Sequence, residues 1–74
     1  MSYPILITVQ DRNQSYRCRL RVGNFTYTAS STSDPQTAVE RLMDKIWPPG
    51  THRATPTGRD LGRGHTEFAI NPIE

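Results

Sequence analysis

The stretch from residue 16 to residue 31 constrains the fold more than any other part of the chain. Apolar or aromatic residues alternate with polar ones on both sides of the dipeptide Gly23-Asn24. Glycine and asparagine tolerate the positive φ of a two-residue hairpin loop, and such a loop pairs residue 22 with 25, 20 with 27 and 18 with 29. The pattern therefore predicts a β-hairpin of strands 16–22 and 25–31.

The predicted register gives the hairpin two chemically different faces. One face suits a hydrophobic core and carries the pairs Val22–Phe25, Leu20–Tyr27 and Cys18–Ala29. The other face carries the pairs Arg21–Thr26, Arg19–Thr28 and Arg17–Ser30. A slip of one residue would mix the two sets, so the alternation and the loop specify the same register.

A helix is predicted directly after the hairpin. Ser33 or Asp34 is the expected N-cap, Pro35 suits the first turn, and Gln36 completes a capping box if Ser33 is the cap. The apolar stripe has helical spacing and consists of Ala38, Val39, Leu42, Met43 and Ile46. Trp47 continues the stripe before a Pro-Pro-Gly sequence ends the helix. We expect Trp47 in the core or as a lid on the sheet edge, with an exposed anchor for a partner as the alternative.

The two ends of the chain complete the sheet. A first strand is predicted over residues 3–10 with a turn over 11–14, and a final strand over 65–71. Residues 51–57 predict a short strand interrupted by a proline, so an extra strand before the last one stays open. The expected fold is a single α+β domain over residues 1–74. Its antiparallel β-sheet of three to five strands carries a single helix packed on one face, in the order β-β-β-α-β.

The positive charge of the chain is concentrated on one strand. The net charge is only +2, but the cations are eight arginines and one lysine. Arginine offers a planar fork of donors that matches carboxylates and phosphates, whereas lysine is a point charge. The excess lies on the predicted strand 16–22, because the C-terminal third is balanced. There Arg53, Arg59 and Arg63 stand against Asp60, Glu67 and Glu74.

The row formed by Arg17, Arg19 and Arg21 has two interpretations. Like charges about 6.6 Å apart on alternate strand residues repel by roughly 0.6 kcal/mol per pair in water, which an ordinary solvated face tolerates. A row built for stability would have acidic residues opposite, but the predicted partners are Thr26, Thr28 and Ser30. Because these hydroxyl residues leave the arginines unneutralised, a binding face for phosphates or acidic side chains is the second interpretation.

No catalytic or cofactor motif is present. Cys18 falls on the core-facing side of the hairpin, where a thiol is inert. His52 and His65 lack the further ligands that tetrahedral zinc requires, and we expect them in loops. The stretch 58–64, GRDLGRG, lacks the lysine and hydroxyl residue of a phosphate-binding loop, although an exposed tip suits a contact loop. We therefore expect no enzyme activity, no metal and no cofactor.

We expect a cytoplasmic protein with no membrane partner. No apolar run approaches the roughly 18–20 residues of a membrane span. The beginning of the chain, MSYPILITVQ, lacks the basic leader, long apolar stretch and cleavage site of a signal peptide. The single cysteine cannot form an internal disulfide, which fits a reducing compartment.

The segment from Phe25 to Trp47, with the strand before it, resembles the second half of a double-stranded-RNA-binding domain. The shared features are a β-hairpin, a serine-led cap and a helix with Ala38 early in its apolar stripe. That family has a helix before its strands, and lysines at the start of its last helix, where this chain has residues 34–37, Asp-Pro-Gln-Thr. A nucleic-acid-binding module that uses the three arginines on phosphates stays open as the alternative function.

The chain as a whole is similar to small phage- and plasmid-encoded anti-CRISPR proteins, especially inhibitors of type I surveillance complexes. The similarity lies in a short first strand after Met1-Ser2, a strand like YRCRLRV, a helix opened by Ser33-Asp34-Pro35 and a strand-rich tail. The resemblance implies a non-enzymatic inhibitor in a bacterial host cell. Such a protein binds a CRISPR-Cas subunit and blocks target DNA recognition or nuclease recruitment. Members that mimic DNA are acidic, whereas this chain is basic, so we expect a direct protein–protein block.

The expected contact surface combines the arginines of the second strand with those of the C-terminal region. Its residues are Arg17, Arg19, Arg21, Thr26, Thr28, Arg53, Arg59 and Arg63. On this interpretation they meet acidic patches on the CRISPR-Cas subunit. An unpaired edge strand could also join two copies of the chain into a homodimer.

Overall fold

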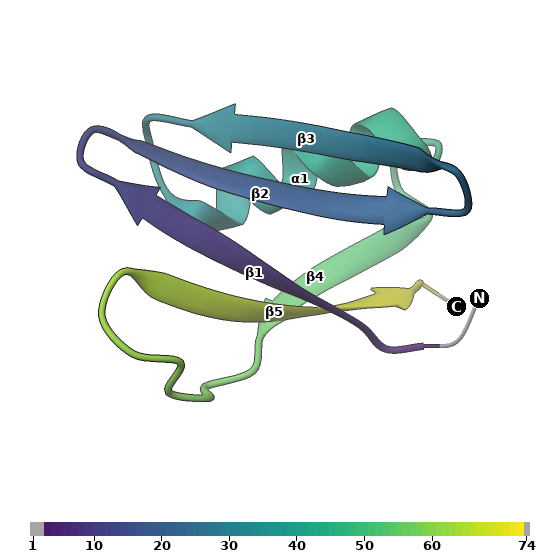
Figure 1. The fold of residues 1–74 in the computed structure, drawn as a ribbon. Coiled ribbons are helices and arrows are strands. Elements are labelled where there is room, and N and C mark those ends of the chain that lie inside the picture. The colour runs from purple at the N-terminus through teal and green to yellow at the C-terminus, as the bar shows by residue number, and fades with distance from the viewer. Residues whose placement is uncertain (1–2, 74) are drawn as a thin grey trace.

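The computed structural model describes residues 3–73 and contains five strands and one helix (Figure 1). The elements are β1 (Ile5–Arg12), β2 (Ser15–Val22), β3 (Phe25–Ser31), α1 (Pro35–Ile46), β4 (His52–Pro56) and β5 (His65–Pro72). All neighbouring strands are antiparallel, and the order across the sheet is β3-β2-β1-β5-β4. The predicted α+β fold with a single helix is therefore confirmed, and β4 is the extra strand before the last.

The register predicted for the second hairpin is confirmed. Strand β2 pairs with β3 in the order expected, from Val22 opposite Phe25 to Cys18 opposite Ala29. In the loop, Gly23 has a positive φ of 62°, a conformation that glycine adopts without steric cost.

The first hairpin is tighter than the predicted turn over residues 11–14. Strand β1 continues through Arg12, which pairs with Ser15, so the loop consists only of Asn13 and Gln14. Asn13 makes this possible because it adopts a φ of 57°, in the left-handed region that asparagine tolerates. The predicted turn was wrong by two residues at its start, and Arg12 belongs to a strand.

Strand β1 belongs to two half-sheets. Its residues 9–12 pair with β2, whereas its residues 5–10 pair with β5. Figure 1 shows β1 starting beside β5 and running to the hairpin that it shares with β2. Strand β4 flanks β5 on its other side. The first half of β1 and the second half of β2 therefore diverge from each other.

Asp34, not Ser33, caps helix α1. Asp34 Oδ1 accepts a hydrogen bond of 2.7 Å from the backbone N–H of Thr37, and this bond lowers the pKa of the Asp34 carboxyl. The capping box expected with Ser33 does not form, because the Gln36 side chain turns to β4. There it donates a hydrogen bond of 2.9 Å to a backbone carbonyl, that of Ala54.

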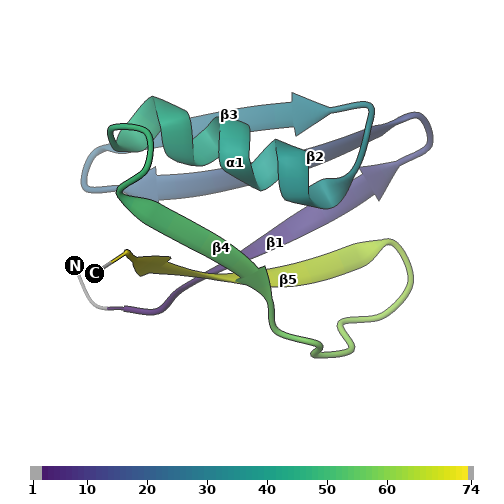
Figure 2. The same cartoon turned by 180° about the vertical axis from the view of Figure 1, so that it is seen from behind.

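Helix α1 bridges the two outer edges of the sheet, and Figure 2 shows it lying between β3 and β4. On the β3 edge, Arg41 Nη1 donates to the carbonyl of Ser30 at 3.0 Å, and Lys45 Nζ donates to the carbonyl of Thr28. On the β4 edge, Gln36 makes the bond to Ala54. Edge strands carry backbone groups that pair readily with other chains, so these bonds occupy part of both edges.

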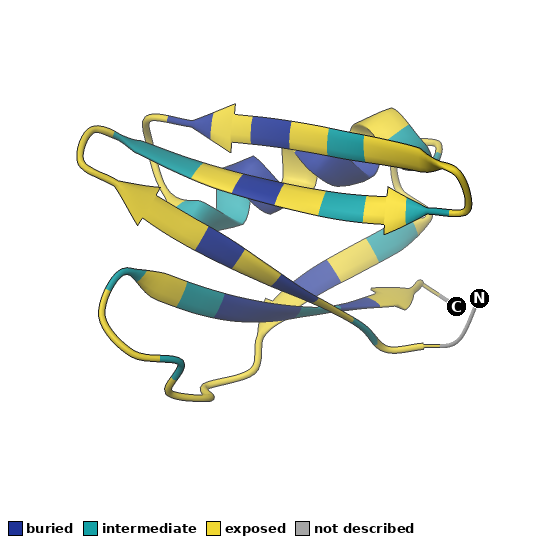
Figure 3. Ribbon diagram, viewed as in Figure 1, coloured by how far each residue is buried: buried dark blue, intermediate teal, exposed yellow. Residues whose placement is uncertain are grey.

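The core lies between α1 and the sheet face that carries the alternate apolar residues, which appear as buried bands in Figure 3. The helix contributes the predicted stripe, in which only Ile46 is half-buried. The sheet contributes Ile7, Val9, Cys18, Ala29, Ala54, Phe68 and Ile70. Phe25 was wrongly predicted to be a core residue, since it is 69% exposed. Lys45, in the last turn of α1, already lies against Thr28, so no further turn of the helix covers Phe25.

Candidate binding surface

The outer face is the face of the sheet that points away from α1. Arg17, Arg19 and Arg21 are exposed on this face of β2, and we call them the arginine row. Figure 3 shows the exposed positions of β2 and β3 alternating with more buried ones. The cross-strand partners of the row are exposed too, and they are the predicted Ser30, Thr28 and Thr26.

Within residues 3–73, no acidic side chain forms an ion pair with the arginine row. The one ion pair in that range joins Arg59 to Glu67 on the β4–β5 half of the sheet. Glu67 is also the only acidic residue at an outward-facing strand position in that range. The arginine row therefore presents its positive charge to solvent or to a docked partner.

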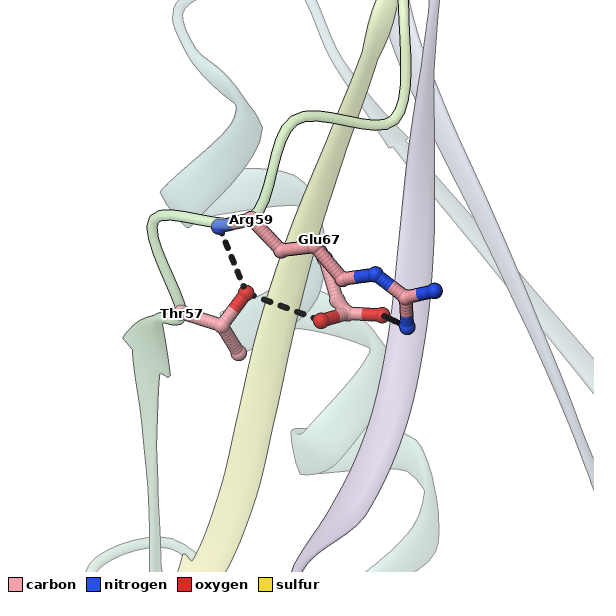
Figure 4. A network of polar contacts seen from close by, with 3 residues as sticks. All are labelled: Thr57, Arg59 and Glu67. Carbon is pink, nitrogen blue, oxygen red and sulfur yellow. Dashed lines mark hydrogen bonds and ion pairs between the residues drawn. The ribbon is translucent and has the colours of Figure 1, made fainter.

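The loop between β4 and β5 covers Glu67, as Figure 4 shows. Thr57 Oγ1 donates a hydrogen bond of 2.9 Å to Glu67 Oε1, and Arg59 Nη1 lies 3.6 Å from Oε2. The backbone N–H of Arg59 donates to Thr57 Oγ1 at 3.2 Å. Only 8% of Glu67 is exposed, so its carboxylate is committed to this loop and Arg59 is engaged within the chain.

An open groove crosses the outer face where β1 and β2 diverge. Its volume is about 710 Å³, and it extends from β1 over β2 to the edge of β3. Arg17 and Arg19 line it, whereas Arg21 does not. Leu6 contributes an apolar side chain that is 53% exposed. The hydroxyl groups in the lining belong to Thr8, Thr28 and Ser30.

Arg12 is a groove residue that the sequence prediction missed. Its Nε and Nη2 both donate to Gln10 Oε1, at 3.3 and 3.2 Å, and Gln10 lies directly opposite Arg17. Because Gln10 Oε1 accepts both bonds, its amide nitrogen remains as a donor toward the groove. The polar alternation of β1 continues through Arg12, and Asn13 is a residue that permits a two-residue loop. These two signals together place Arg12 on the polar face of a strand, while its position at the groove comes from the structure.

The remaining predicted contact residues lie outside the groove. Arg21 Nε donates to the Gly23 carbonyl at 3.3 Å, so its side chain folds back over the hairpin loop. Arg53 belongs to β4 and lines a separate hollow with Asn71, while Arg63 is exposed in the loop before β5. The structure therefore places Arg17 and Arg19 in the groove and Arg21 at the hairpin loop. The other predicted arginines form a second group on the β4–β5 half.

Cys18 lies on the core-facing side of the sheet, as its place in the alternation predicted. Its thiol contacts the carbonyl of Ala38 at 3.3 Å and that of Ala29 at 3.8 Å, and only 2% of the residue is exposed. Burial away from water raises the pKa of the Cys18 thiol to about 11, although Lys45 and the contact with Ala29 lower it. The thiol is therefore protonated at neutral pH, which is unfavourable for a nucleophile.

His52 was expected in a loop, but it begins β4 and is held by its neighbours. Its ring stacks on Trp47, with centroids 4.0 Å apart, so Trp47 covers this end of the sheet. Thr51 Oγ1 uses its one proton on the Pro48 carbonyl at 2.7 Å, so it accepts from His52 Nδ1 at 2.9 Å. His52 Nε2 then accepts from the Tyr3 hydroxyl at 2.9 Å. Both ring nitrogens are thus satisfied within the protein.

Across residues 3–73, no group of three or more histidine, cysteine, aspartate or glutamate side chains could hold a metal ion. The same residues contain no helix that is long and apolar enough to span a membrane. His65 is exposed at the start of β5, opposite Gln10.

The groove is the part of the outer face where positive charge, hydroxyl groups and a concave shape coincide. Its cations include Arg12, Arg17 and Arg19 from two adjacent strands, together with Lys45 from the helix. No family model, curated protein or solved structure matches this chain.

Proposed function

We propose that this chain is a non-enzymatic binding protein that docks on an acidic surface of a partner protein through the groove, with Arg17 and Arg19 of the arginine row as its cationic contacts. The observation that carries this proposal is that Arg17 and Arg19 line an open groove in which none of the described residues is acidic and neither arginine forms an ion pair. Charged residues that stabilise a sheet have opposite charges across from them. Here the opposite positions hold Thr28 and Ser30, whose hydroxyls add donors for carboxylates.

A protein partner fits the groove better than a nucleic acid. Proteins that bind single strands stack bases on aromatic side chains, and none of the residues that line the groove is aromatic. Leu6 offers an exposed apolar contact instead, which suits the mixed character of protein interfaces. Binding of phosphates by the same arginines remains the alternative that an experiment has to exclude.

The resemblance to anti-CRISPR proteins supplies the class of partner. We propose a subunit of a type I CRISPR-Cas surveillance complex, whose target DNA recognition or nuclease recruitment the chain blocks by occupying an acidic patch. The surface of this chain is mildly basic, with a formal net charge of +2, which favours an acidic protein partner over DNA mimicry.

A pull-down tests this function. The tagged protein is used as bait in a lysate of bacteria with an active type I CRISPR system, with and without added nuclease. We expect capture of surveillance-complex subunits that survives nuclease. Capture of only nuclease-sensitive material contradicts the proposal and supports phosphate binding instead.

Two charge-matched variants locate the contact. Arg17→Glu/Arg19→Glu reverses two charges in the groove, and Arg53→Glu/Arg63→Glu reverses two exposed charges outside it. Circular dichroism checks that both variants fold. We expect the first to lose capture and the second to retain it, whereas the opposite result would move the contact to the β4–β5 half.

A further inference from the structure

The ladder between β1 and β2 stops before either strand ends. Its last pair is Val9 with Cys18, although β1 starts at Ile5 and β2 runs to Val22. Beyond that pair, β1 follows β5 and β2 follows β3. In the described structure a wedge thus opens between residues 5–8 of β1 and residues 19–22 of β2.

Backbone hydrogen-bonding groups of both strands point into this wedge. A two-residue hairpin loop is closed by a pair that exchanges both backbone bonds, here Arg12 with Ser15, and every second pair after it does the same. The backbone of Asp11 confirms this alternation. Its N–H points away from β2 and donates to the Gly64 carbonyl at 2.8 Å. The last pair, Val9 with Cys18, is a non-hydrogen-bonded pair, so the ladder ends with the flanking backbone bond from the Arg19 N–H to the Thr8 carbonyl. The groups that face the wedge without a ladder partner are therefore the N–H and C=O of Leu6 and Arg21, the N–H of Thr8 and the C=O of Arg19.

The side chains along the wedge alternate in character. On the outer face Arg19 lines the groove, so its guanidinium is available to a group placed across from it. On the core-facing side Ile5, Leu20 and Val22 are only half-buried, although they belong to the apolar face of the sheet. The wedge therefore offers cationic contacts on the outer face of the sheet and apolar contacts on its core-facing side.

Both outer edges of the sheet are partly occupied within the chain. Arg41 and Lys45 hold two carbonyls of the β3 edge, and Gln36 holds one carbonyl of the β4 edge. Pro56 removes a further N–H donor from β4. These features disfavour the addition of a strand at either outer edge.

We propose that the wedge binds an extended segment of the partner protein as an added strand, which pairs with both backbone groups of Arg21 and with the carbonyl of Arg19 on β2. Strand addition supplies affinity through backbone hydrogen bonds and specificity through alternate side chains. The bound segment carries acidic residues on the side that meets Arg19 and apolar residues on the side that meets Leu20. This inference rests on the proposed binding of an acidic partner protein, and it specifies the conformation and sequence pattern of the bound segment.

Amide hydrogen exchange tests strand addition directly. The probe is an acetylated pentapeptide of alternating glutamate and valine, added in excess to the full chain. We expect the amide of Arg21 to exchange about tenfold more slowly with the peptide, because it becomes hydrogen-bonded. A peptide with glutamine in place of glutamate should bind more weakly. If the peptide does not bind, or binds without slowing this amide, strand addition is wrong.

A matched pair of variants separates backbone from side-chain contributions. Arg21→Pro removes the N–H that faces the wedge and spares the bonds of β2 to β3, whereas Arg21→Gln removes only the charge. We expect the proline variant to lose peptide binding and the glutamine variant to keep it. Should the proline variant fail to fold, a peptide N-methylated at alternate residues gives the same test on the unaltered protein, and undiminished binding of that peptide would contradict the inference.

The pull-down and the exchange experiment can fail separately. Capture that depends on the arginine row, without slower exchange at Arg21, would leave the proposed function standing and overturn strand addition. Slower exchange with the peptide, without capture of CRISPR subunits, would support strand addition and reject the proposed partner. Single-stranded DNA of equal charge serves as the third probe, and equal protection of the Arg21 amide by DNA would contradict a peptide site.

Discussion

The exposed arginines of β1 and β2 differ in what their side chains do. Gln10 holds Arg12 at the groove, whereas Arg21 folds back over the hairpin loop to the Gly23 carbonyl. Strand alternation alone treats Arg17, Arg19 and Arg21 as equivalent, because it specifies a face and not the direction of a long side chain. The bonds of Arg12 and Arg21 were therefore beyond a prediction from sequence.

Single substitutions test this ranking of the arginines. We expect Arg12→Gln and Arg17→Gln each to weaken binding of the partner about tenfold, since each removes charge-assisted hydrogen bonds to a carboxylate. Arg21→Gln should change the affinity little. Titration calorimetry with the captured partner measures this, and equal weakening by all three substitutions would show that only the net charge matters.

Cys18 should react slowly with thiol reagents while the chain is folded. Its pKa of about 11 leaves little thiolate at pH 8, and only 2% of the residue is exposed. We expect modification by a disulfide reagent to be roughly a hundredfold slower in buffer than in denaturant. Comparable rates in the two conditions would mean that the sheet opens readily at Cys18.

The cap at Asp34 should make stability depend on pH in acid. Thr37 lowers the pKa of the Asp34 carboxyl in the folded chain, so this cap stabilises fully above the ordinary value of 3.8. The stabilisation is then lost as pH falls through the lowered folded pKa. Urea unfolding between neutral and strongly acidic pH should show a smaller acid loss for Asp34→Asn, which still caps, than for the wild type. The control Asp44→Asn, on the exposed side of α1, should follow the wild type.

At the scale of elements, local signals predicted what local chemistry controls. The loop at Gly23 and the alternation agree on one register for β2 and β3, and the structure has that register. Asp34, one of the two expected caps, caps the helix. The capping box that was expected with Ser33 does not form, because the Gln36 side chain bonds to β4, which is distant in sequence. Phe25 differed for a similar reason, since its burial depends on where the helix ends over β3.

The contacts of α1 with both sheet edges should limit self-association. Arg41→Ala/Lys45→Ala releases the carbonyls of Ser30 and Thr28 on the β3 edge. We expect this variant to associate more strongly than the wild type in analytical ultracentrifugation at high concentration. The control Glu40→Ala/Asp44→Ala changes two charges on the exposed side of the same helix. If both variants sediment alike, these contacts do not protect the edge.

For the molecule as a whole, the fold class followed from sequence but the path of β1 did not. Pairing of β1 with both β2 and β5 joins residues far apart in the chain, and no local residue pattern encodes it. The groove and the wedge both arise from that dual pairing. The sequence therefore identified the face that carries the arginine row, while the concave shape and the contribution of Arg12 required the structure.

Binding of acidic groups by the groove, and not by positive charge in general, can be tested directly. The measurement is the NMR shift of the arginine side-chain Nε–H signals during titration with a short oligoglutamate at physiological salt, where long-range attraction is screened. We expect shifts at Arg12, Arg17 and Arg19, with little change at Arg53 and Arg63. Shifts of similar size at all five arginines would contradict this expectation, because they would show binding to charge without a defined site.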